Sequence, residues 1–563
     1  MPCVGFFAPV PYQEKQISAE PTIADNETLY ECDSGRRISL DVGTRSVLII
    51  GGTGSGKTRS VVLPMISNLI KNNLSGTIID VKGNLRSQVR AIAAEHNRLE
   101  DVIEFGSHPS ANKTNFISEL DEYEVKELMN SFALENVSHD HNAHFFLHGA
   151  KIFYDIYKVL NDISKIHPDC HFSLQFKPTL EKIYEIANNL QLARGLWTFY
   201  TTSLSIMLQE CKAEGKEPSQ HLIDAETFVN QVKSDNFHVF KEQSSEFNNT
   251  YYEQLSFAIN HINSSFNSLK VTHNLLSNFS STSNNSIPFD FDKLIYQDNK
   301  IILIHFAIDS GTAGNILSKS IKEKFYQSII KNGLNYQKKT FMIADEFQHI
   351  IDVSNKKRLN DMDFFSISRE YNNINVVATQ SISSLKSKGD SNSISSLIAN
   401  CITKIILQCS DEQTNNWFKF LFSESNLCLK SLRKGECFIE TIDCYNNITN
   451  RKETINKEYD KSKKIIDKYT DQTSKSIMSS PLPYRLGAGK FPRIISEILM
   501  INVPNQTKGR KVIFDYDNYA KNIYNKLDYI RDLSLRGIDY WSITNDNSDN
   551  FYSTQSNTQL ELI

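Results

Sequence analysis

The sequence has no long apolar run and no excess of charge of either sign. Its 563 residues include 61 Lys and Arg against 65 Asp and Glu, which gives a formal net charge of -4. No stretch approaches the roughly 18 consecutive apolar residues of a membrane-spanning helix. The opening MPCVGFFAPVPYQEK lacks the basic segment and the long apolar segment of a signal peptide. We therefore expect a cytoplasmic protein without a membrane span, in which any polyanionic partner binds at local basic patches.

Paired cysteine motifs are also missing. None of the cysteines forms a CxxC pair, and those between residues 401 and 444 lie mostly among apolar residues. The nine cysteines are Cys3, Cys32, Cys170, Cys211, Cys401, Cys409, Cys428, Cys437 and Cys444. Disulfides are not expected in the cytoplasm, and the spacing favours buried free thiols over a zinc site.

A cluster of histidines occurs without the glutamate of an HExxH motif. Its members are His139, His141, His144 and His148. The last two are four residues apart and would share one face of a helix, so a metal site is one interpretation. Surface or packing histidines are the interpretation that the pattern favours.

What the sequence does contain is a nucleotide-binding motif. The apolar run Val47 to Ile50 is typical of a buried strand, and GGTGSGKT after it matches GxxxxGK[ST] at every fixed position. The segment RSVVLPMISNLIKN continues with apolar residues at helical spacing. Glycines let backbone N–H groups surround phosphates, and the helix N-terminus adds its positive end. The predicted phosphate-binding residues are Gly51, Gly52, Thr53, Gly54, Ser55, Gly56, Lys57 and Thr58.

These residues predict ATP and Mg²⁺ as cofactors. Lys57 is expected to contact the β- and γ-phosphates, and the Thr58 hydroxyl to bind Mg²⁺. A second apolar strand, in TFMIADEFQHI, ends in Asp345 and Glu346. Asp345 is the candidate Mg²⁺ ligand, and Glu346 is the candidate group that polarises the attacking water. Many strands end in acidic residues, so the interpretation depends on the phosphate-binding motif upstream.

Two further residues are candidates for the catalytic centre. Gln380 ends the strand INVVATQS, where a polar side chain beside the nucleotide could sense the γ-phosphate. Arg369 precedes that strand and could reach the nucleotide of a neighbouring subunit as an arginine finger. The alternative for Arg369 is a surface arginine on a helix. Asp80, at the end of the strand in GTIIDVKGN, is either a ligand-binding or a turn-capping carboxylate.

The order of strands and helices predicts an α/β fold with a parallel central sheet and an all-α insertion. We expect five segments: an N-terminal arm with short strands (1–45), the first part of the core (46–120), the all-α insertion (121–298), the second part of the core (299–425) and a mixed C-terminal region with a polar tail (426–563). The Ser- and Asn-rich stretch 277–288 is predicted to be a flexible loop, KGECFIETIDC a strand pair, and the charged stretch 451–476 a solvated helix or linker.

With these motifs in place, the sequence resembles the coupling ATPases of type IV secretion and conjugation, in the FtsK/HerA class of P-loop motor ATPases. The matching pieces are GGTGSGKT, IIDVKGN, a helix opening with Phe145, Phe146 and Ala150, IADEFQ, SREYNNINVVATQS and ANCITKIILQCSDEQT. The resemblance implies a RecA-like core, a homohexameric ring with a central channel and nucleotides between subunits. It assigns Lys57, Thr58, Asp345 and Glu346 to the hydrolytic centre, Gln380 to the polar residue beside it and Arg369 to the trans-acting arginine.

The resemblance also implies DNA or DNA–protein conjugates as substrates, and secretion or conjugation machinery as a partner. Typical members begin with a membrane anchor that this sequence lacks. The anchor would then be a separate protein that holds the motor at the inner membrane. Alternatively, the protein is a HerA-like DNA translocase in DNA processing or antiphage defence, or a nucleotide-switched platform that recruits proteins. The candidate DNA contacts are Lys356, Lys357, Arg358, Lys386 and Lys388. The alternative is that these basic residues are ordinary solvent-exposed side chains.

Overall fold

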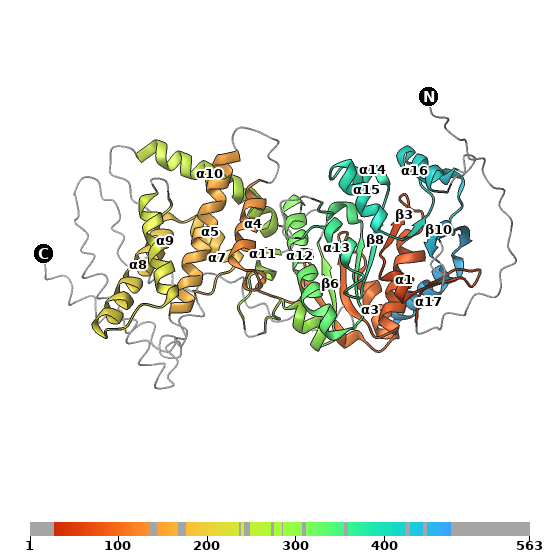
Figure 1. The fold of residues 1–563 in the computed structure, drawn as a ribbon, viewed down its shortest axis with the longest axis horizontal. Helices are drawn as coiled ribbons and strands as arrows, with labels where there is room; N and C mark the ends of the chain where they lie inside the picture. Colours follow the sequence, from red (N-terminus) through yellow and green to blue (C-terminus); the bar gives the residue numbers. More distant parts are fainter. Residues whose placement is uncertain are drawn as a thin grey trace, which may run out of the picture.

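The computed structural model describes residues 27–134, 143–166, 176–235, 238–240, 248–271, 275–283, 285–306, 311–353, 359–422, 428–442 and 448–473. Figure 1 shows two lobes side by side, a sheet flanked by helices on the right and a group of helices on the left. In the part of the chain that the structure describes, no helix is long and apolar enough to cross a membrane.

The right-hand lobe is built on one nine-stranded sheet. Its strands are β3 (Val47–Ile50), β4 (Ser75–Asp80), β5 (Val102–Gly106), β6 (Ile301–His305), β7 (Thr340–Asp345), β8 (Asn373–Thr379), β9 (Thr403–Ile406), β10 (Glu436–Ile442) and β11 (Ile448–Thr454). They lie in the order β11-β10-β9-β3-β8-β7-β4-β6-β5. All strands from β9 to β5 run parallel, whereas β10 and β11 form an antiparallel hairpin at one edge. The expected α/β fold with a parallel central sheet is confirmed.

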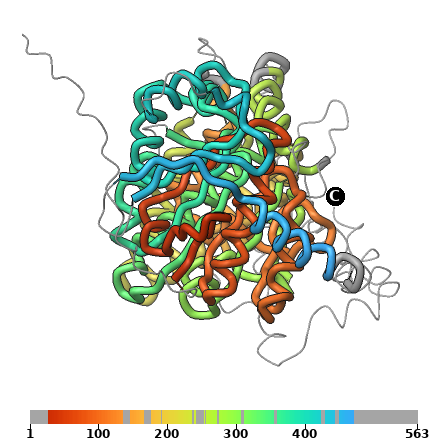
Figure 2. The backbone as a smooth tube through the Cα atoms, turned by 90° about the vertical axis from the view of Figure 1, so that its right-hand side faces the viewer, coloured from red at the N-terminus to blue at the C-terminus, as the bar shows by residue number. Residues whose placement is uncertain are grey.

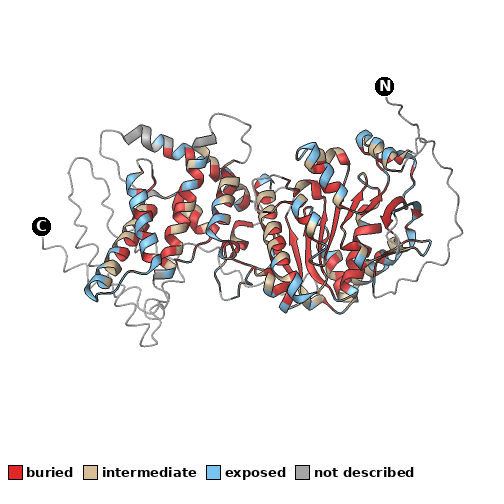
Figure 3. Ribbon diagram, in the orientation of Figure 1, coloured by how far each residue is buried: buried red, intermediate tan, exposed pale blue. Residues whose placement is uncertain are grey.

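Helices cover both faces of the sheet because both faces are apolar. Within β3, Val47 and Ile49 enter one core and Leu48 and Ile50 the other, as the alternation of side chains along a strand requires. Figure 3 shows the resulting buried strands between partly exposed helices. The covering elements are β1 (Thr28–Glu31), β2 (Arg37–Ser39), α1 (Leu40–Gly43), η2 (Thr58–Val62), α2 (Leu63–Lys71), α3 (Arg86–Glu95), α12 (Gly311–Tyr336), α13 (Asp361–Ile367), α14 (Ile382–Lys386), α15 (Ser391–Asn400), α16 (Glu412–Phe422) and α17 (Asn456–Thr473).

The left-hand lobe is helical and is inserted between β5 and β6, and thus between the two nucleotide-site motifs. Its helices are α4 (Glu122–Ala133), α5 (Ala143–Ile166), α7 (Leu180–Ala187), α8 (Leu190–Ala213), α9 (Gln220–Ser234), α10 (Asn248–Val271) and α11 (Leu275–Asn278). Along α5, Ala150, Phe153, Tyr157 and Leu160 are buried on one face, as their helical spacing predicts. Thr179 caps α7 by accepting a hydrogen bond of 3.1 Å from the Lys182 amide.

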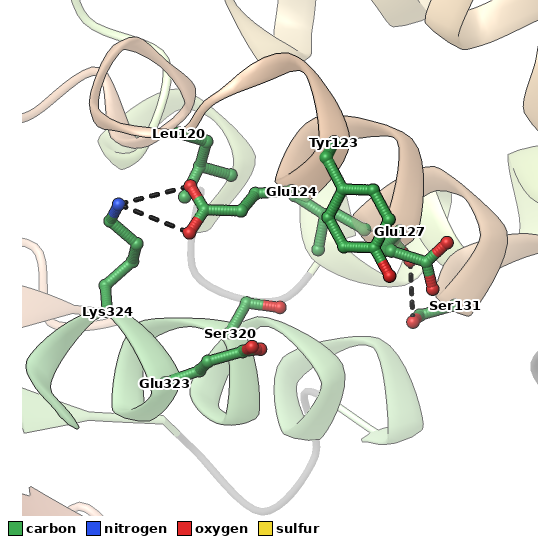
Figure 4. A pocket seen from close by; sticks show the side chains of 9 residues that line it. Leu120, Tyr123, Glu124, Glu127, Ser131, Ser320, Glu323 and Lys324 are labelled. Atoms are coloured by element: carbon green, nitrogen blue, oxygen red, sulfur yellow. Dashed lines mark hydrogen bonds and ion pairs between the residues drawn. The ribbon is translucent and has the colours of Figure 1, made fainter. Parts of the chain in front are cut away.

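The insertion packs against α12 of the sheet lobe through α4 and α10. Lys324 on α12 donates to both carboxylate oxygens of Glu124 on α4, at 3.4 and 3.1 Å. Figure 4 shows this ion pair at one end of a small pocket between the two helices, with the exposed Tyr123 at its rim. None of the residues that line this pocket belongs to the predicted nucleotide site.

The stretch 277–288 is packed at its start, at residues 278–280, and its described residues from 281 to 288 are exposed or half-buried. The amide of Ile287 donates to the Lys113 carbonyl at 2.9 Å, and Ser280 is buried in a β-bridge with Asn115. Backbone N–H and C=O groups of the loop thus find hydrogen-bond partners within the protein, which the Ser- and Asn-rich composition did not predict. The expected loop is present in this stretch, and it is tied to the segment that contains Lys113 and Asn115.

The C-terminal expectations also need correction. The segment KGECFIETIDC contributes one strand, β10, and its partner β11 begins before the charged stretch and ends within it. These two strands extend the sheet beyond residue 425, so that position does not mark the end of the core. Residues 456–473 of the charged stretch form α17, a helix with mostly exposed residues, as predicted, and one side of it packs on α3, η2 and α2. Figure 2 looks at this edge of the molecule, with the hairpin and α17 in blue.

Candidate nucleotide site

The phosphate-binding loop joins β3 to η2 and is held by the ends of two neighbouring strands. The Gly51 amide donates to the Thr379 carbonyl at the end of β8, at 3.2 Å. The Gly52 amide donates to the Gln408 carbonyl just beyond β9, at 2.9 Å. Gly54 and Gly56 have φ values of +80° and +96°, a backbone conformation that favours glycine. The loop thus follows the path that the glycine pattern predicts.

The first helical turn after the loop is adapted to a proline. Pro64 has no amide hydrogen, so it cannot donate to the Ser60 carbonyl as a helical residue would. The buried Tyr30 hydroxyl supplies that hydrogen bond instead, at 2.8 Å. The turn widens to a π-helix over η2, with the Leu63 amide donating to the Thr58 carbonyl. Tyr30 therefore stabilises the turn that carries Lys57 and Thr58.

Asp345 lies against Thr58 although the two are far apart in sequence. The Thr58 hydroxyl donates to Asp345 Oδ2 at 2.8 Å. Burial raises the pKa of Asp345, and the nearby Glu346 charge adds to this, while Thr58 and Lys57 act in the opposite direction. A cation beside this carboxylate would favour its ionised form.

Glu346 has a left-handed backbone, with φ 55° and ψ 45°. Such a conformation costs about 1–3 kcal/mol in a non-glycine residue and persists only where surrounding contacts enforce it. Its Oε2 accepts hydrogen bonds from Gln348 Nε2 at 2.5 Å and Gln380 Nε2 at 2.8 Å, and its Oε1 contacts Lys82 Nζ. Burial favours the neutral acid, but the contacts with Lys82 and Gln348 outweigh it, so the pKa of Glu346 is lowered.

Lys57 completes this arrangement from the loop side. Its ammonium donates to the Gly51 carbonyl at 3.1 Å and lies 3.9 Å from Glu346 Oε1. The structure therefore brings Lys57, Thr58, Asp345 and Glu346 together. Gln380 joins them because β8 lies between β3 and β7 in the sheet.

The residues present fit a nucleotide phosphate and a divalent cation. Ser55 Oγ, inside the loop, is buried and has no hydrogen-bond partner, as expected for a group that waits for a ligand. The Thr58 hydroxyl and the Asp345 carboxylate are hard oxygen ligands of the kind that Mg²⁺ prefers. Lys57 and the loop amides provide positive charge for phosphate oxygens.

Asp80, at the end of β4, acts as the cap of the turn that follows. It accepts backbone hydrogen bonds from Lys82, Gly83 and Leu85, at 3.1, 2.9 and 2.6 Å. Burial, together with the charge of Asp345, raises the pKa of Asp80 to about 6 against these hydrogen bonds. The turn-capping interpretation of Asp80 agrees with these contacts, and the turn it caps carries Lys82.

Arg369 is not brought to the phosphate-binding loop of its own chain. It is exposed, in the turn between α13 and the start of β8, and not in a helix as one interpretation held. Gln380 lies at the other end of this seven-residue strand, roughly 20 Å along it. Arg369 has Arg45 as a neighbour: burial lowers the pKa of Arg45, and the charge of Arg369 lowers it further.

Other predicted residues contribute less to this site. Lys386 ends α14 and Lys388 is exposed beyond it, whereas 356–358 lie outside the described residues. Of the histidine cluster, positions 144 and 148 are in α5, and 139 and 141 are not described. Within the described ranges, no group of three or more His, Cys, Asp or Glu side chains is placed to hold a metal. Free thiols are buried at Cys32, Cys401, Cys409 and Cys437 and partly buried at Cys211 and Cys428, and positions 3, 170 and 444 are not described.

Sequence reasoning did not assign Lys82 and Gln348 to the site. Lys82 was placed only in a turn, and its contact with Glu346 depends on β4 lying beside β7. Gln348 lies two residues after Glu346, and its Oε1 accepts a hydrogen bond of 2.9 Å from the Thr379 hydroxyl. Only their positions in the sequence could have indicated a role in the site, because each follows within three residues of a strand that ends in aspartate.

The family described as type IV secretory system conjugative DNA transfer matches residues 8–422. The chain belongs to this family. Because the match includes both nucleotide-site motifs, the parallel sheet carries the nucleotide site of an ATPase of type IV conjugative DNA transfer. No curated protein sequence matches.

Three solved structures are similar to the chain at low sequence identity. The conjugative coupling protein TrwB without its first 70 residues is 14% identical, with a TM-score of 0.46 over 77% of this chain and 83% of that chain. TrwB with ADP and Mg²⁺ is 13% identical, with a TM-score of 0.48 over 77% and 91%. VirB4 of Thermoanaerobacter pseudethanolicus is 11% identical, with a TM-score of 0.40 over 76% and 95%. The family assignment rests on the sequence match and on the sheet.

Proposed function

We propose that this coupling ATPase forms a homohexameric ring that uses ATP and Mg²⁺ to move DNA, or DNA joined to a protein, toward conjugation or secretion machinery. One observation carries the proposal. The carboxyl ends of β3, β7 and β8 bring five side chains together, within the residues that match a conjugative DNA transfer family: Lys57, Thr58, Asp345, Glu346 and Gln380. The protein would work in the cytoplasm, and a separate partner would hold it at the inner membrane.

Each residue at this edge has a role in the proposed reaction. Lys57 and the loop amides bind the β- and γ-phosphates, and Thr58 and Asp345 hold Mg²⁺, which neutralises phosphate charge. Glu346 orients and polarises the attacking water, because its ionised carboxylate faces the loop. Gln380 contacts Glu346, so it can report on whether a γ-phosphate occupies the loop.

Arg369 is proposed to act on the nucleotide of a neighbouring copy. It is exposed near the amino end of β8, away from the phosphate-binding loop of its own chain, so a nucleotide that it contacts would belong to a neighbouring copy. A guanidinium placed there can stabilise charge on the transferring phosphoryl group.

A roadblock assay tests the motor. Streptavidin is bound to one end of biotinylated DNA, single- or double-stranded, and its ATP-dependent displacement is measured with wild-type protein and the Glu346→Gln variant. The proposal predicts displacement by wild type and none by Glu346→Gln, which should still bind ATP. Binding of DNA without ATP-dependent displacement would contradict a motor. Nucleotide-dependent affinity for a protein partner in its place would favour the recruiting platform.

A further inference from the structure

A buried ion pair lies directly behind the turn that begins at Glu346. Lys322 on α12 and Asp361 at the start of α13 are 2% and 0% exposed. The ammonium nitrogen lies 2.6 and 2.7 Å from the two carboxylate oxygens of Asp361. Charges this deeply buried persist only when their remaining hydrogen-bonding capacity is also satisfied.

The lysine donates a hydrogen bond to the backbone of the turn that follows Glu346. Residues Phe347–His349 form a short 3₁₀ helix that starts at Glu346. Lys322 Nζ donates to the Ile350 carbonyl at the end of this turn, at 2.6 Å, and lies 5.0 Å from the centre of the Phe347 ring. A buried carbonyl at a helix end needs such a donor. The lysine therefore fixes both the far end of the turn and the ring inside it.

The aspartate connects the same point to the following segment. Asp361 accepts hydrogen bonds from the Tyr326 hydroxyl at 2.9 Å and from the Asp352 amide at 2.7 Å. Its own amide donates to the Asp352 carbonyl at 2.9 Å. The chain that leaves the Glu346 turn is thus held to α12 and α13 by one network of buried polar groups.

We propose that Lys322 and Asp361 are positioning residues for Glu346, which hold the turn so that its carboxylate faces the phosphate-binding loop. The left-handed backbone of Glu346 is costly and requires support from its surroundings. The ion pair supplies that support from a distance without touching the nucleotide site. The catalytic part of this inference rests on the proposed function, whereas the structural part does not.

The test removes both charges together, since a single substitution would leave an unpaired buried charge and could prevent folding. The variant is Lys322→Met with Asp361→Leu. The matched control is Lys404→Met with Glu440→Leu, which removes a second buried pair, at 2.5 Å between β9 and β10, that does not contact the Glu346 turn. Hydrogen exchange of the Phe347–Ile351 amides, ATP affinity and kcat are measured for each.

In the Lys322→Met/Asp361→Leu variant, we expect hydrogen exchange at the turn amides to be at least about tenfold faster than in wild type. We expect its kcat to be at least about tenfold lower and its ATP affinity to stay within about threefold. The control pair should change neither turn exchange nor kcat by more than about twofold. Unchanged exchange in the turn, or faster exchange in the turn without a loss of kcat, would overturn the proposal.

The exchange readout also separates the two inferences. If the wild-type protein hydrolyses no ATP, the proposed function fails. Faster exchange confined to the turn would then still support the positioning role, and equal exchange in both pair variants would refute it.

Discussion

At the scale of single residues, the contacts of Glu346 show what spacing can and cannot predict. The adjacency of Asp345 and Glu346 at a strand end, and their pairing with Lys57 and Thr58, follow from two local motifs. The contact with Lys82 does not, because it requires β4 and β7 to be neighbours in the sheet. Strand order depends on packing across the whole lobe, and a single sequence carries little direct record of it.

Gln380 provides a prediction at this scale. Its Nε2 donates to Glu346 at 2.8 Å, so Gln380→Ala removes one of the donors that hold the carboxylate. We expect kcat to fall by about 10- to 100-fold, with ATP affinity within about threefold. Steady-state kinetics and ATP titration measure both. The control is Gln220→Ala on α9 of the insertion, whose exposed side chain donates to Asp224 at 2.9 Å and whose loss should leave kcat unchanged. Equal effects of the two substitutions would count against a role for the Gln380 side chain.

At the scale of elements, α17 shows what a charged composition can and cannot predict. Half of its 18 residues are Lys, Asp or Glu, a composition that predicts a solvent-exposed helix. Two adjacent apolar residues, Ile465 and Ile466, nonetheless pack against the core, and Lys468 pairs with Glu95 on α3 at 2.7 Å. Two apolar side chains are enough to hold a charged helix against the protein when a complementary apolar surface is present. The existence of that surface could not be known from the α17 sequence.

The helical insertion offers a pH-dependent prediction. Burial at the start of α7, together with the charge of Glu185, raises the pKa of Glu181 from 4.5 to about 7, although Lys270 and Lys113 oppose this. Because the folded pKa is the higher one, the stabilising contribution is complete below about pH 4.5 and is lost as pH rises to about 7. Glu181→Gln should therefore raise Tm by a few degrees at pH 8 and leave it unchanged at pH 4.

Thermal unfolding at both pH values checks this prediction. Glu226→Gln, on the exposed side of α9, is the control and should leave Tm unchanged at either pH. A gain in Tm for Glu181→Gln that is equal at pH 4 and pH 8 would show that the charge of Glu181 is not its cause.

At the scale of the whole molecule, the fold class and the position of the insertion were predictable, and the extent of the sheet was not. Two motifs separated by a long helical stretch predict a split core directly. The hairpin β10–β11 lies after irregular sequence, and its pairing with β9 is a long-range contact without a local signal. The proposed ring likewise depends on surfaces between copies, which local patterns do not encode.

Subunit mixing tests whether nucleotide sites are shared between copies. Lys57→Ala and Arg369→Ala should each be nearly inactive, since each removes one half of every shared site. An equal mixture should recover about a quarter of the wild-type sites, because a site then forms between an intact Lys57 and a neighbour's intact Arg369. ATP hydrolysis across mixing ratios measures the recovery. A mixture no more active than its components would contradict an arginine acting in trans.

The most direct test of the account is steady-state ATP hydrolysis with and without single- and double-stranded DNA, measured alongside the mass of the protein in solution. A DNA-driven ring predicts strong stimulation by at least one form of DNA, together with a particle of six copies. The Glu346→Gln variant should abolish hydrolysis without dissociating the particle. A monomer with slow hydrolysis that DNA does not change would contradict the motor.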